Sequence, residues 1–201
     1  MYLSPQYYIE IPATITAFTN IYLAARANIW NWLFGLVAVT LYSIIFYRTR
    51  LYGDMSLQAI YFYFQIYGWY QWRYGSEKHT ALTVKRMPKS LYLITILVMG
   101  SLFGAFIFIL SHYTNSTTPI IDAFTTALSL IAQWMMCKKW LENWWLWILL
   151  DIVSVEMYWY KHLYITAGLY AVFLILCCSG YRIWKKTLQH EASACVKKAR
   201  L

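Results

Sequence analysis

Seven apolar stretches, separated by short connections, constrain the fold of this 201-residue chain more than any other feature. Each is close to the length of about 17–25 residues that a helix needs to cross a bilayer. Because backbone groups in lipid must hydrogen-bond within their own segment, such stretches form helices. The sequence therefore predicts an all-α, polytopic membrane protein with seven transmembrane helices. The stretches are Ile9–Ala25, Ile29–Tyr47, Leu57–Trp72, Leu91–Ser111, Ile120–Cys137, Leu141–Tyr160 and Leu163–Ile183.

Composition supports a lipid environment for most of the chain. Hydrophobic residues make up 61% and charged residues only 12%, whereas a soluble domain carries about 25% charged residues. The net charge of +9 could suggest nucleic acid, but the basic residues lie in short runs between apolar stretches. Such runs are typical of orientation signals, so we expect membrane lipid and no nucleic acid as a partner.

The distribution of Lys and Arg predicts how the chain is oriented. With seven crossings, fourteen of the 17 basic residues fall on one side of the membrane, and only Arg48, Arg50 and Lys161 fall on the other. Basic connections stay in the cytoplasm during insertion. We therefore expect the N-terminus outside and the C-terminus in the cytoplasm.

An internal repeat emerges when the chain is aligned with itself at an offset of 112 residues. The offset pairs Arg26 with Lys138, Asn31-Trp32 with Asn143-Trp144, Leu51-Tyr52 with Leu163-Tyr164, Gly68 with Gly180, and Trp72 with Trp184. Three crossings reverse the side of the chain and the fourth helix restores it, so the two copies have the same orientation. This predicts a 3+1+3 parallel-repeat arrangement. A substrate path is expected between the copies, although repetition for stability alone is the alternative.

The repeat also predicts the organisation of the chain. Residues 1–201 form a single membrane domain, in which 7–73 are the first three-helix repeat and 119–185 the second. Residues 90–112 form the linker helix, and 186–201 form a cytoplasmic tail.

Aromatic and acidic residues share one face of the sixth predicted helix. Trp144, Trp147 and Asp151 follow at spacings of three and four residues. Indole faces bind planar cations, and an acid at membrane depth usually lines a cavity or forms an ion pair. The alternatives are an interfacial aromatic belt for Trp144 and a structural ion pair for Asp151. Glu156 lies about 140° around the same helix, so both acids cannot face one narrow cavity.

Amides and aromatic rings share a face of the third predicted helix. Gln58, Gln65 and Trp69 belong to this face, and Gln133 on the fifth helix is a weaker candidate. A buried Gln can donate and accept hydrogen bonds to ribose hydroxyls or a carboxamide. The alternative is that these amides only join neighbouring helices.

Motifs for catalysis are absent from the sequence. There is no phosphate-binding Gly-rich loop, no metal-spaced His/Cys set and no activated nucleophile, and the four cysteines show no ligand spacing. We therefore expect no enzyme activity, no cofactor and no metal.

Two segments resemble the PnuC vitamin transporters over nearly the whole chain. They are Leu51-Tyr52-Gly53 with Gln65-Ile66-Tyr67-Gly68-Trp69-Tyr70-Gln71-Trp72, and Glu142-Asn143-Trp144-Trp145-Leu146-Trp147 with Asp151-Ile152-Val153-Ser154-Val155 and Arg182-Ile183-Trp184. The resemblance implies a SWEET-like seven-helix fold in a bacterial inner membrane, and a homotrimer. It further implies facilitated diffusion of a vitamin that is trapped inside by phosphorylation.

The resemblance also implies which residues contact the substrate. Gln65, Tyr67 and Trp69 match the family positions on the third helix, and Trp144, Trp145 and Trp147 match those on the sixth. Together with Gln133 and Asp151, these residues form the predicted substrate-binding set. Asp151 departs from the pattern, because the riboside carriers of the family are expected to have Asn at this position.

The predicted function is uptake of nicotinamide riboside, with thiamine as the alternative. Both vitamins contain a positively charged aromatic ring, which suits indole rings and a carboxylate. A membrane scaffold subunit without a substrate is the alternative from a different class.

Overall fold

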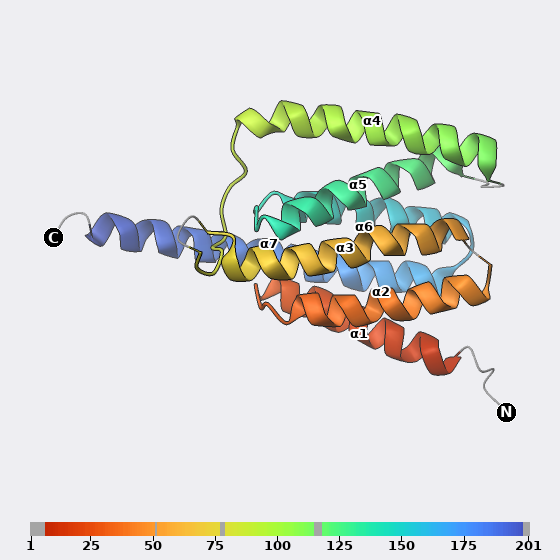
Figure 1. Ribbon diagram of the computed structural model, residues 1–201, viewed down its shortest axis with the longest axis horizontal. Coiled ribbons are helices and arrows are strands. Elements are labelled where there is room, and N and C mark those ends of the chain that lie inside the picture. Colours follow the sequence, from red (N-terminus) through yellow and green to blue (C-terminus); the bar gives the residue numbers. More distant parts are fainter. Residues whose placement is uncertain (1–6, 51, 77–78, 115–117, 199–201) are drawn as a thin grey trace. The chain divides into compact units, whose positions relative to one another are not determined.

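The computed structural model describes residues 7–50, 52–76, 79–114 and 118–198, which form seven helices and no strand (Figure 1). This confirms the all-helical prediction. Leu51, Lys78 and Arg200, which the sequence analysis uses, lie outside the described residues. The helices are α1 (Tyr7–Ala25), α2 (Asn31–Arg48), α3 (Tyr52–Tyr74), α4 (Ser90–Tyr113), α5 (Pro119–Cys137), α6 (Asn143–Tyr160) and α7 (Tyr164–Lys198).

Helix length and hydropathy agree with a membrane location. Within the described residues, α2, α4, α5 and the segment Tyr164–Glu191 of α7 are long and apolar enough to cross a membrane. The other three helices have 19, 23 and 18 residues, which is also a spanning length, but they contain more polar side chains. The seventh predicted stretch ends at Ile183, whereas α7 continues without a break to Lys198. The first part of the predicted tail is therefore helical.

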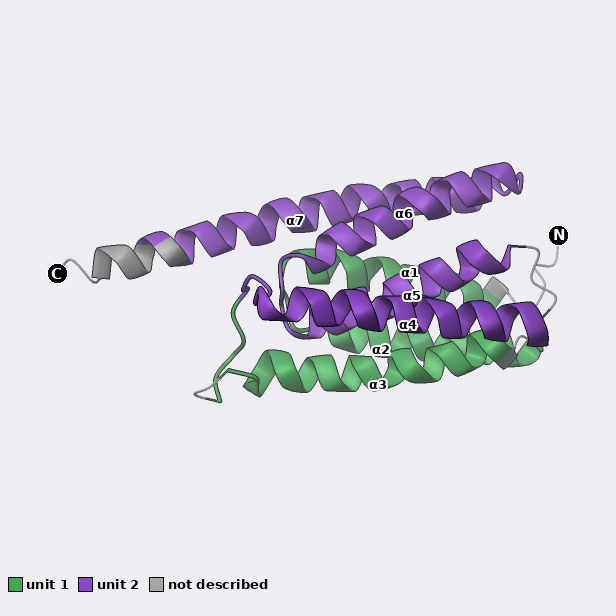
Figure 2. Cartoon of the chain, turned by 90° about the horizontal axis from the view of Figure 1, so that it is seen from above, with its two compact units in different colours: residues 1–83 green, residues 84–201 purple. Residues whose placement is uncertain are grey.

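The chain divides into two compact units, Met1–Thr83 and Val84–Leu201 (Figure 2). In the first unit α2 packs against both α1 and α3. In the second unit α6 packs against both α5 and α7, and α4 lies along α5. No residue of α4 is buried, and its mean hydropathy of 2.6 suits contact with lipid.

The helix bounds of the two units differ by a constant 112 residues. Adding 112 to the bounds of α1 and α2 gives the bounds of α5 and α6, and adding 112 to the first residue of α3 gives the first residue of α7. The turns agree as well. Ala27 and Lys139 close α1 and α5 in the left-handed conformation, with φ of 52° and 51°, and Arg50 and His162 do the same after α2 and α6, with φ of 59° and 58°.

Indole rings stacked on glycine join the helices in each unit. Trp32 of α2 meets Trp72 of α3 edge to face at 5.2 Å, and Trp144 of α6 meets Trp184 of α7 at 5.4 Å. A Cβ atom built on Gly68 would collide with the ring of Trp32. Gly180 lies against Trp144 in the same way, so only glycine allows these helices to approach so closely.

A backbone clamp joins the start of the second unit to its α5–α6 turn. Lys85 N donates to Lys139 O at 3.0 Å, and Leu141 N donates to Lys85 O at 2.9 Å. The Glu142 carboxylate accepts a 2.9 Å hydrogen bond from Met87 N and is also hydrogen-bonded to the hydroxyl of Tyr92. The clamp brings the basic residues of these two connections to one end of the unit.

Candidate functional site

The two units can be compared position by position to separate residues that build the fold from residues that differ between the copies. The Trp–Trp–Gly contacts and the left-handed turns occur in both units and therefore belong to the fold. Three matched pairs differ in chemistry: Gly35 and Trp147, Val39 and Asp151, and Gln65 and Cys177. These differing positions are where a ligand-specific role is expected.

In the first unit, the differing positions place a buried amide against a glycine. Gln65 of α3 is 6% exposed, and its Oε1 has no hydrogen-bond partner. A Cβ atom on Gly35 of α2 would collide with this side chain. Asn20 of α1 lies beside the same glycine and donates from Nδ2 to Asn31 O at 2.7 Å. Three helices thus place polar groups around Gly35.

In the second unit, the differing positions place an acid and an indole on one face of α6. Asp151 is 3% exposed, and its Oδ2 has no hydrogen-bond partner. The thiol of Cys177 on α7 is hydrogen-bonded to the Asp151 carboxylate, and no basic side chain among the described residues neutralises it. Trp147 lies one helical turn before Asp151, and its buried Nε1 also lacks a partner.

Such unsatisfied groups are costly, which makes their position informative. A buried polar group without a partner costs about 1–3 kcal/mol, and more if it is charged. Trp32 and Trp144 also have unpaired Nε1 atoms, but they do so in both units and so reflect the shared packing. The unpaired atoms of Gln65, Trp147 and Asp151 have no counterpart at the matched positions. They are therefore the best candidates for contact with a ligand.

The structure gives Trp144 and Trp145 different environments. Trp144 is 1% exposed and fills the contact between α6 and α7. Trp145 is 55% exposed, and its ring lies 4.9 Å from that of Tyr181. The interfacial-belt alternative does not describe Trp144, because its ring is enclosed within its own unit.

The remaining predicted residues lie on α3 and α5. Tyr67 is half-buried, stacks on Tyr63 at 6.0 Å and accepts a 2.8 Å hydrogen bond from Gln71. Trp69 is half-buried and meets Trp30 edge to face at 5.9 Å. Gln133 is buried within the second unit.

The two acids of α6 have opposite environments, as the helical geometry predicts. Asp151 is buried, whereas Glu156 is exposed. Of the two, only Asp151 needs a partner to offset the loss of water, so it is the better candidate for binding a cation.

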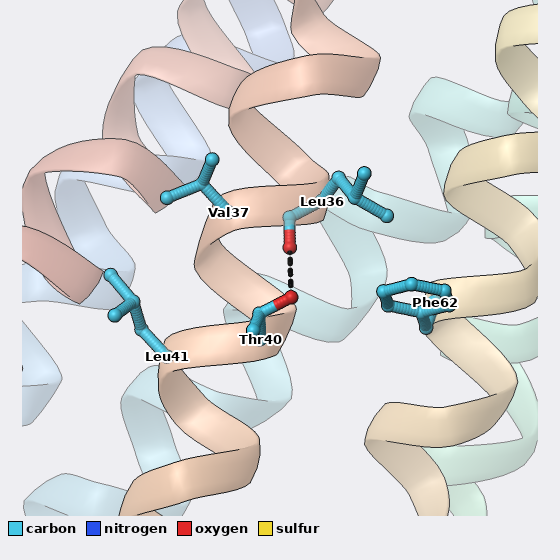
Figure 3. A pocket seen from close by; sticks show the side chains of 5 residues that line it. All are labelled: Leu36, Val37, Thr40, Leu41 and Phe62. Carbon is cyan, nitrogen blue, oxygen red and sulfur yellow. Dashed lines mark hydrogen bonds between the residues drawn. The ribbon is translucent and has the colours of Figure 1, made fainter.

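A hollow of about 210 Å³ lies between α2 and α3 in the first unit (Figure 3). It is lined by Leu36, Val37, Thr40, Leu41 and Phe62. Its one hydroxyl, on Thr40, donates at 2.8 Å to Leu36 O of its own helix. The hollow therefore offers apolar surface, which suits a lipid chain rather than a polar vitamin.

Sequence reasoning missed Cys177, which it treated as inert, and the part of Gly35 in making room for Gln65. The signal that could have found both is the exchange of residue types at matched positions. Across residues 7–50, 52–76, 79–114 and 118–198, no three His, Cys, Asp or Glu side chains gather to hold a metal ion.

Comparison with known proteins agrees with this architecture. The nicotinamide riboside transporter PnuC of Escherichia coli K12 is 28% identical over 92% of this chain and 88% of its own length. The transporter of the same name from Neisseria mucosa is also 28% identical, over 94% of this chain and 76% of its own. The crystal structure of a vitamin B3 transporter PnuC matches with a TM-score of 0.71 and 26% identity, covering 93% of this chain and 84% of that one.

The match to the family is continuous along the chain. A family model described as nicotinamide mononucleotide transporter covers residues 7–186, from the first residue of α1 into α7. It therefore includes both three-helix segments, the helix between them and every residue of the candidate site. Seven helices of spanning length, relatives similar over nearly their full length and this match show that the chain belongs to the PnuC family of membrane transporters.

Proposed function

We propose that this protein carries nicotinamide riboside across the bacterial inner membrane by facilitated diffusion, and that phosphorylation inside the cell makes uptake one-way. The proposal is supported by the family and by the names of its relatives. The observation that carries it is Asp151, a buried acid with an unpaired Oδ2 on the same face of α6 as the unpaired Nε1 of Trp147.

Charge complementarity connects this site to the substrate. The pyridinium ring of nicotinamide riboside is planar and positively charged, so an indole face can bind it and a carboxylate can neutralise it. The cost of a charged group at membrane depth, about 2.5–3.5 kcal/mol on the insertion scale, is offset while the cation is bound. A neutral solute would leave Asp151 without compensation.

The proposed binding set is the one predicted from the sequence: Gln65, Tyr67, Trp69, Gln133, Trp144, Trp145, Trp147 and Asp151. Within it, Gln65 supplies an unpaired acceptor for a ribose hydroxyl or the carboxamide, and Trp147 supplies an unpaired donor. Trp144 supports the site by fixing α6 on α7.

We propose the 3+1+3 parallel repeat as the framework for transport, with repeats at 7–73 and 119–185, the linker helix at 90–112 and the tail at 186–201. The equal helix bounds and the matching left-handed turns support it. Two similar triplets can alternate access by moving as rigid bodies around a fixed site. We also propose a homotrimer, which native mass spectrometry of the detergent-solubilised protein tests.

Uptake into liposomes tests the mechanism. Purified protein should equilibrate radiolabelled nicotinamide riboside down its own gradient, and ionophores that abolish sodium and proton gradients should leave the rate unchanged. Uptake that stops when either ion gradient is removed would contradict facilitated diffusion. Unlabelled thiamine, the alternative substrate, should compete weakly; if it competes better than the riboside, the substrate assignment is wrong.

Substitution of the acid tests the site. Asp151→Asn should weaken binding of nicotinamide riboside by about tenfold or more, because a hydrogen bond to a charged group contributes about 1.5–3 kcal/mol. Glu156→Gln is the matched control, since it removes an exposed acid from the same helix. Equal effects of the two substitutions on the dissociation constant, measured by isothermal titration calorimetry, would reject a specific role for Asp151.

A further inference from the structure

The Asp151 carboxylate is held by a residue outside the predicted binding set. The partner is Cys177 of α7, which is 4% exposed and whose thiol is hydrogen-bonded to the carboxylate. The bond leaves Oδ2 of Asp151 without a partner. The acid is thus tied to the neighbouring helix while retaining an oxygen that can accept a ligand.

A thiol suits this position for an electrostatic reason. A Lys or Arg side chain here would neutralise Asp151 and compete with a cationic substrate. An apolar side chain would leave both oxygens buried and unbonded, which favours the uncharged form of the acid. A thiol is a weak donor, so it orients the carboxylate without satisfying its charge.

The matched positions of the first unit explain why residue 177 is short. Its counterpart is Gln65, whose side chain uses the space left by Gly35. In the second unit Trp147 stands at the position that matches Gly35. A long amide at position 177 would therefore compete with an indole ring for the same space, whereas a cysteine fits beside it.

We propose that Cys177 is a positioning residue that holds the Asp151 carboxylate toward the positively charged ring of the substrate and so sets the preference for a cation over its uncharged form. This inference rests on the proposed function. Cys177 acts through Asp151 and needs no contact with the substrate itself.

The test compares two ligands of nearly the same shape. Nicotinamide riboside is cationic, and its reduced dihydro form is uncharged. Calorimetric titration of the purified full-length protein gives the ratio of their affinities. Cys177→Ala and Cys177→Val both remove the donor, so the test survives if one of them does not fold. Each should reduce the ratio by about three- to tenfold, in line with the loss of one hydrogen bond to a charged group.

Controls separate positioning from packing. Cys177→Ser keeps a donor and should hold the ratio near the wild-type value. Cys178→Ala removes the adjacent, half-buried thiol and should leave the ratio unchanged. In an Asp151→Asn background, Cys177→Ala should have no further effect on the ratio, because the residue acts through the carboxylate.

Three results would overturn the inference. An unchanged ratio, or an equal loss of affinity for both ligands, would show that Cys177 only fills space. A full effect in the Asp151→Asn background would show that it does not act through the acid. Wild-type protein that binds neither ligand would instead refute the proposed function, and the inference would fall with it.

Discussion

At the scale of single residues, the same side chain has different roles depending on whether both units contain it. Trp32 and Trp144 are matched, buried and packed on glycine, so they build the fold. Trp147 and Asp151 have apolar or absent counterparts, and both carry unpaired polar atoms. Because unpaired buried polar groups are destabilising, a difference confined to one unit indicates a ligand rather than packing.

Glycine substitution tests the packing role. Gly180→Ala should lower stability by about 1–3 kcal/mol, because the new methyl group would collide with Trp144. Gly68→Ala should behave alike against Trp32. Gly168→Ala is the matched control on the same helix as Gly180, because nothing lies within 4 Å of its new Cβ atom. The melting temperature in detergent measures each change; equal melting temperatures for the two α7 variants would contradict the assigned contact.

Lys139 predicts a pH dependence of stability. Burial lowers the pKa of this lysine, in the connection between α5 and α6, from its ordinary value of 10.5 to about 8, and Glu191 partly opposes the shift. Between these two pH values the unfolded chain binds more protons than the folded protein, so stability rises with pH across this window. Lys139→Met should therefore raise the melting temperature most below pH 8, and the gain over wild type should shrink toward pH 10.5.

The pH profile of melting temperature separates this titration from a packing effect. Lys138→Met removes the neighbouring charge and is the matched control. A gain for Lys139→Met that stays constant from pH 7 to pH 10.5 would show that titration of the lysine is not its cause.

At the scale of elements, the turns matter as much as the helices. The first two helices of each unit end in a left-handed residue that is not glycine, at Ala27, Arg50, Lys139 and His162. Glycine is the usual signal for such an end, so sequence reasoning placed the starts of α2 and α6 two residues too early. The spacing of apolar residues predicted the helices themselves, because lipid selects for length and hydropathy.

The Glu142 clamp gives a prediction for the connection before α4. Glu142→Ala removes the acceptor for Met87 N and the hydroxyl of Tyr92. Loss of these bonds should cost about 1–3 kcal/mol and loosen residues 84–89. Limited trypsin digestion should then cut faster after Lys85 and Arg86.

The matched variant for this clamp is Glu142→Gln, which keeps an acceptor oxygen and should be cut at nearly the wild-type rate. Cleavage after Arg73, which precedes the clamped segment, should be equal in all three proteins. An increase at Arg73 as large as that at Lys85 would indicate general unfolding instead of release of the clamp.

At the scale of the whole molecule, two similar units differ where a substrate would need them to differ. The first unit presents an amide acceptor beside a glycine, and the second presents an acid and an indole. A vitamin with a charged ring and a neutral sugar needs both kinds of partner. Divergence of a duplicated triplet supplies both kinds without changing the fold.

Orientation is the whole-molecule property that the basic residues predict. Green fluorescent protein fused after Leu201 should fluoresce, because it folds in the cytoplasm, and alkaline phosphatase at the same position should be inactive, since it requires the oxidising periplasm. The reverse pattern would contradict the cytoplasmic C-terminus. Western blotting of both fusions confirms equal expression.

The sequence alone determined the helices, the family and the repeat at an offset of 112 residues, because hydrophobic length and local motifs are properties of short segments. It also identified Gln65, Trp147 and Asp151 as positions where the copies had diverged. Tertiary structure decided which indoles are enclosed, which acid is buried and which thiol holds it. These depend on how neighbouring helices approach, and that approach is set by glycines such as Gly35 and Gly180, whose neighbours cannot be read from a linear pattern.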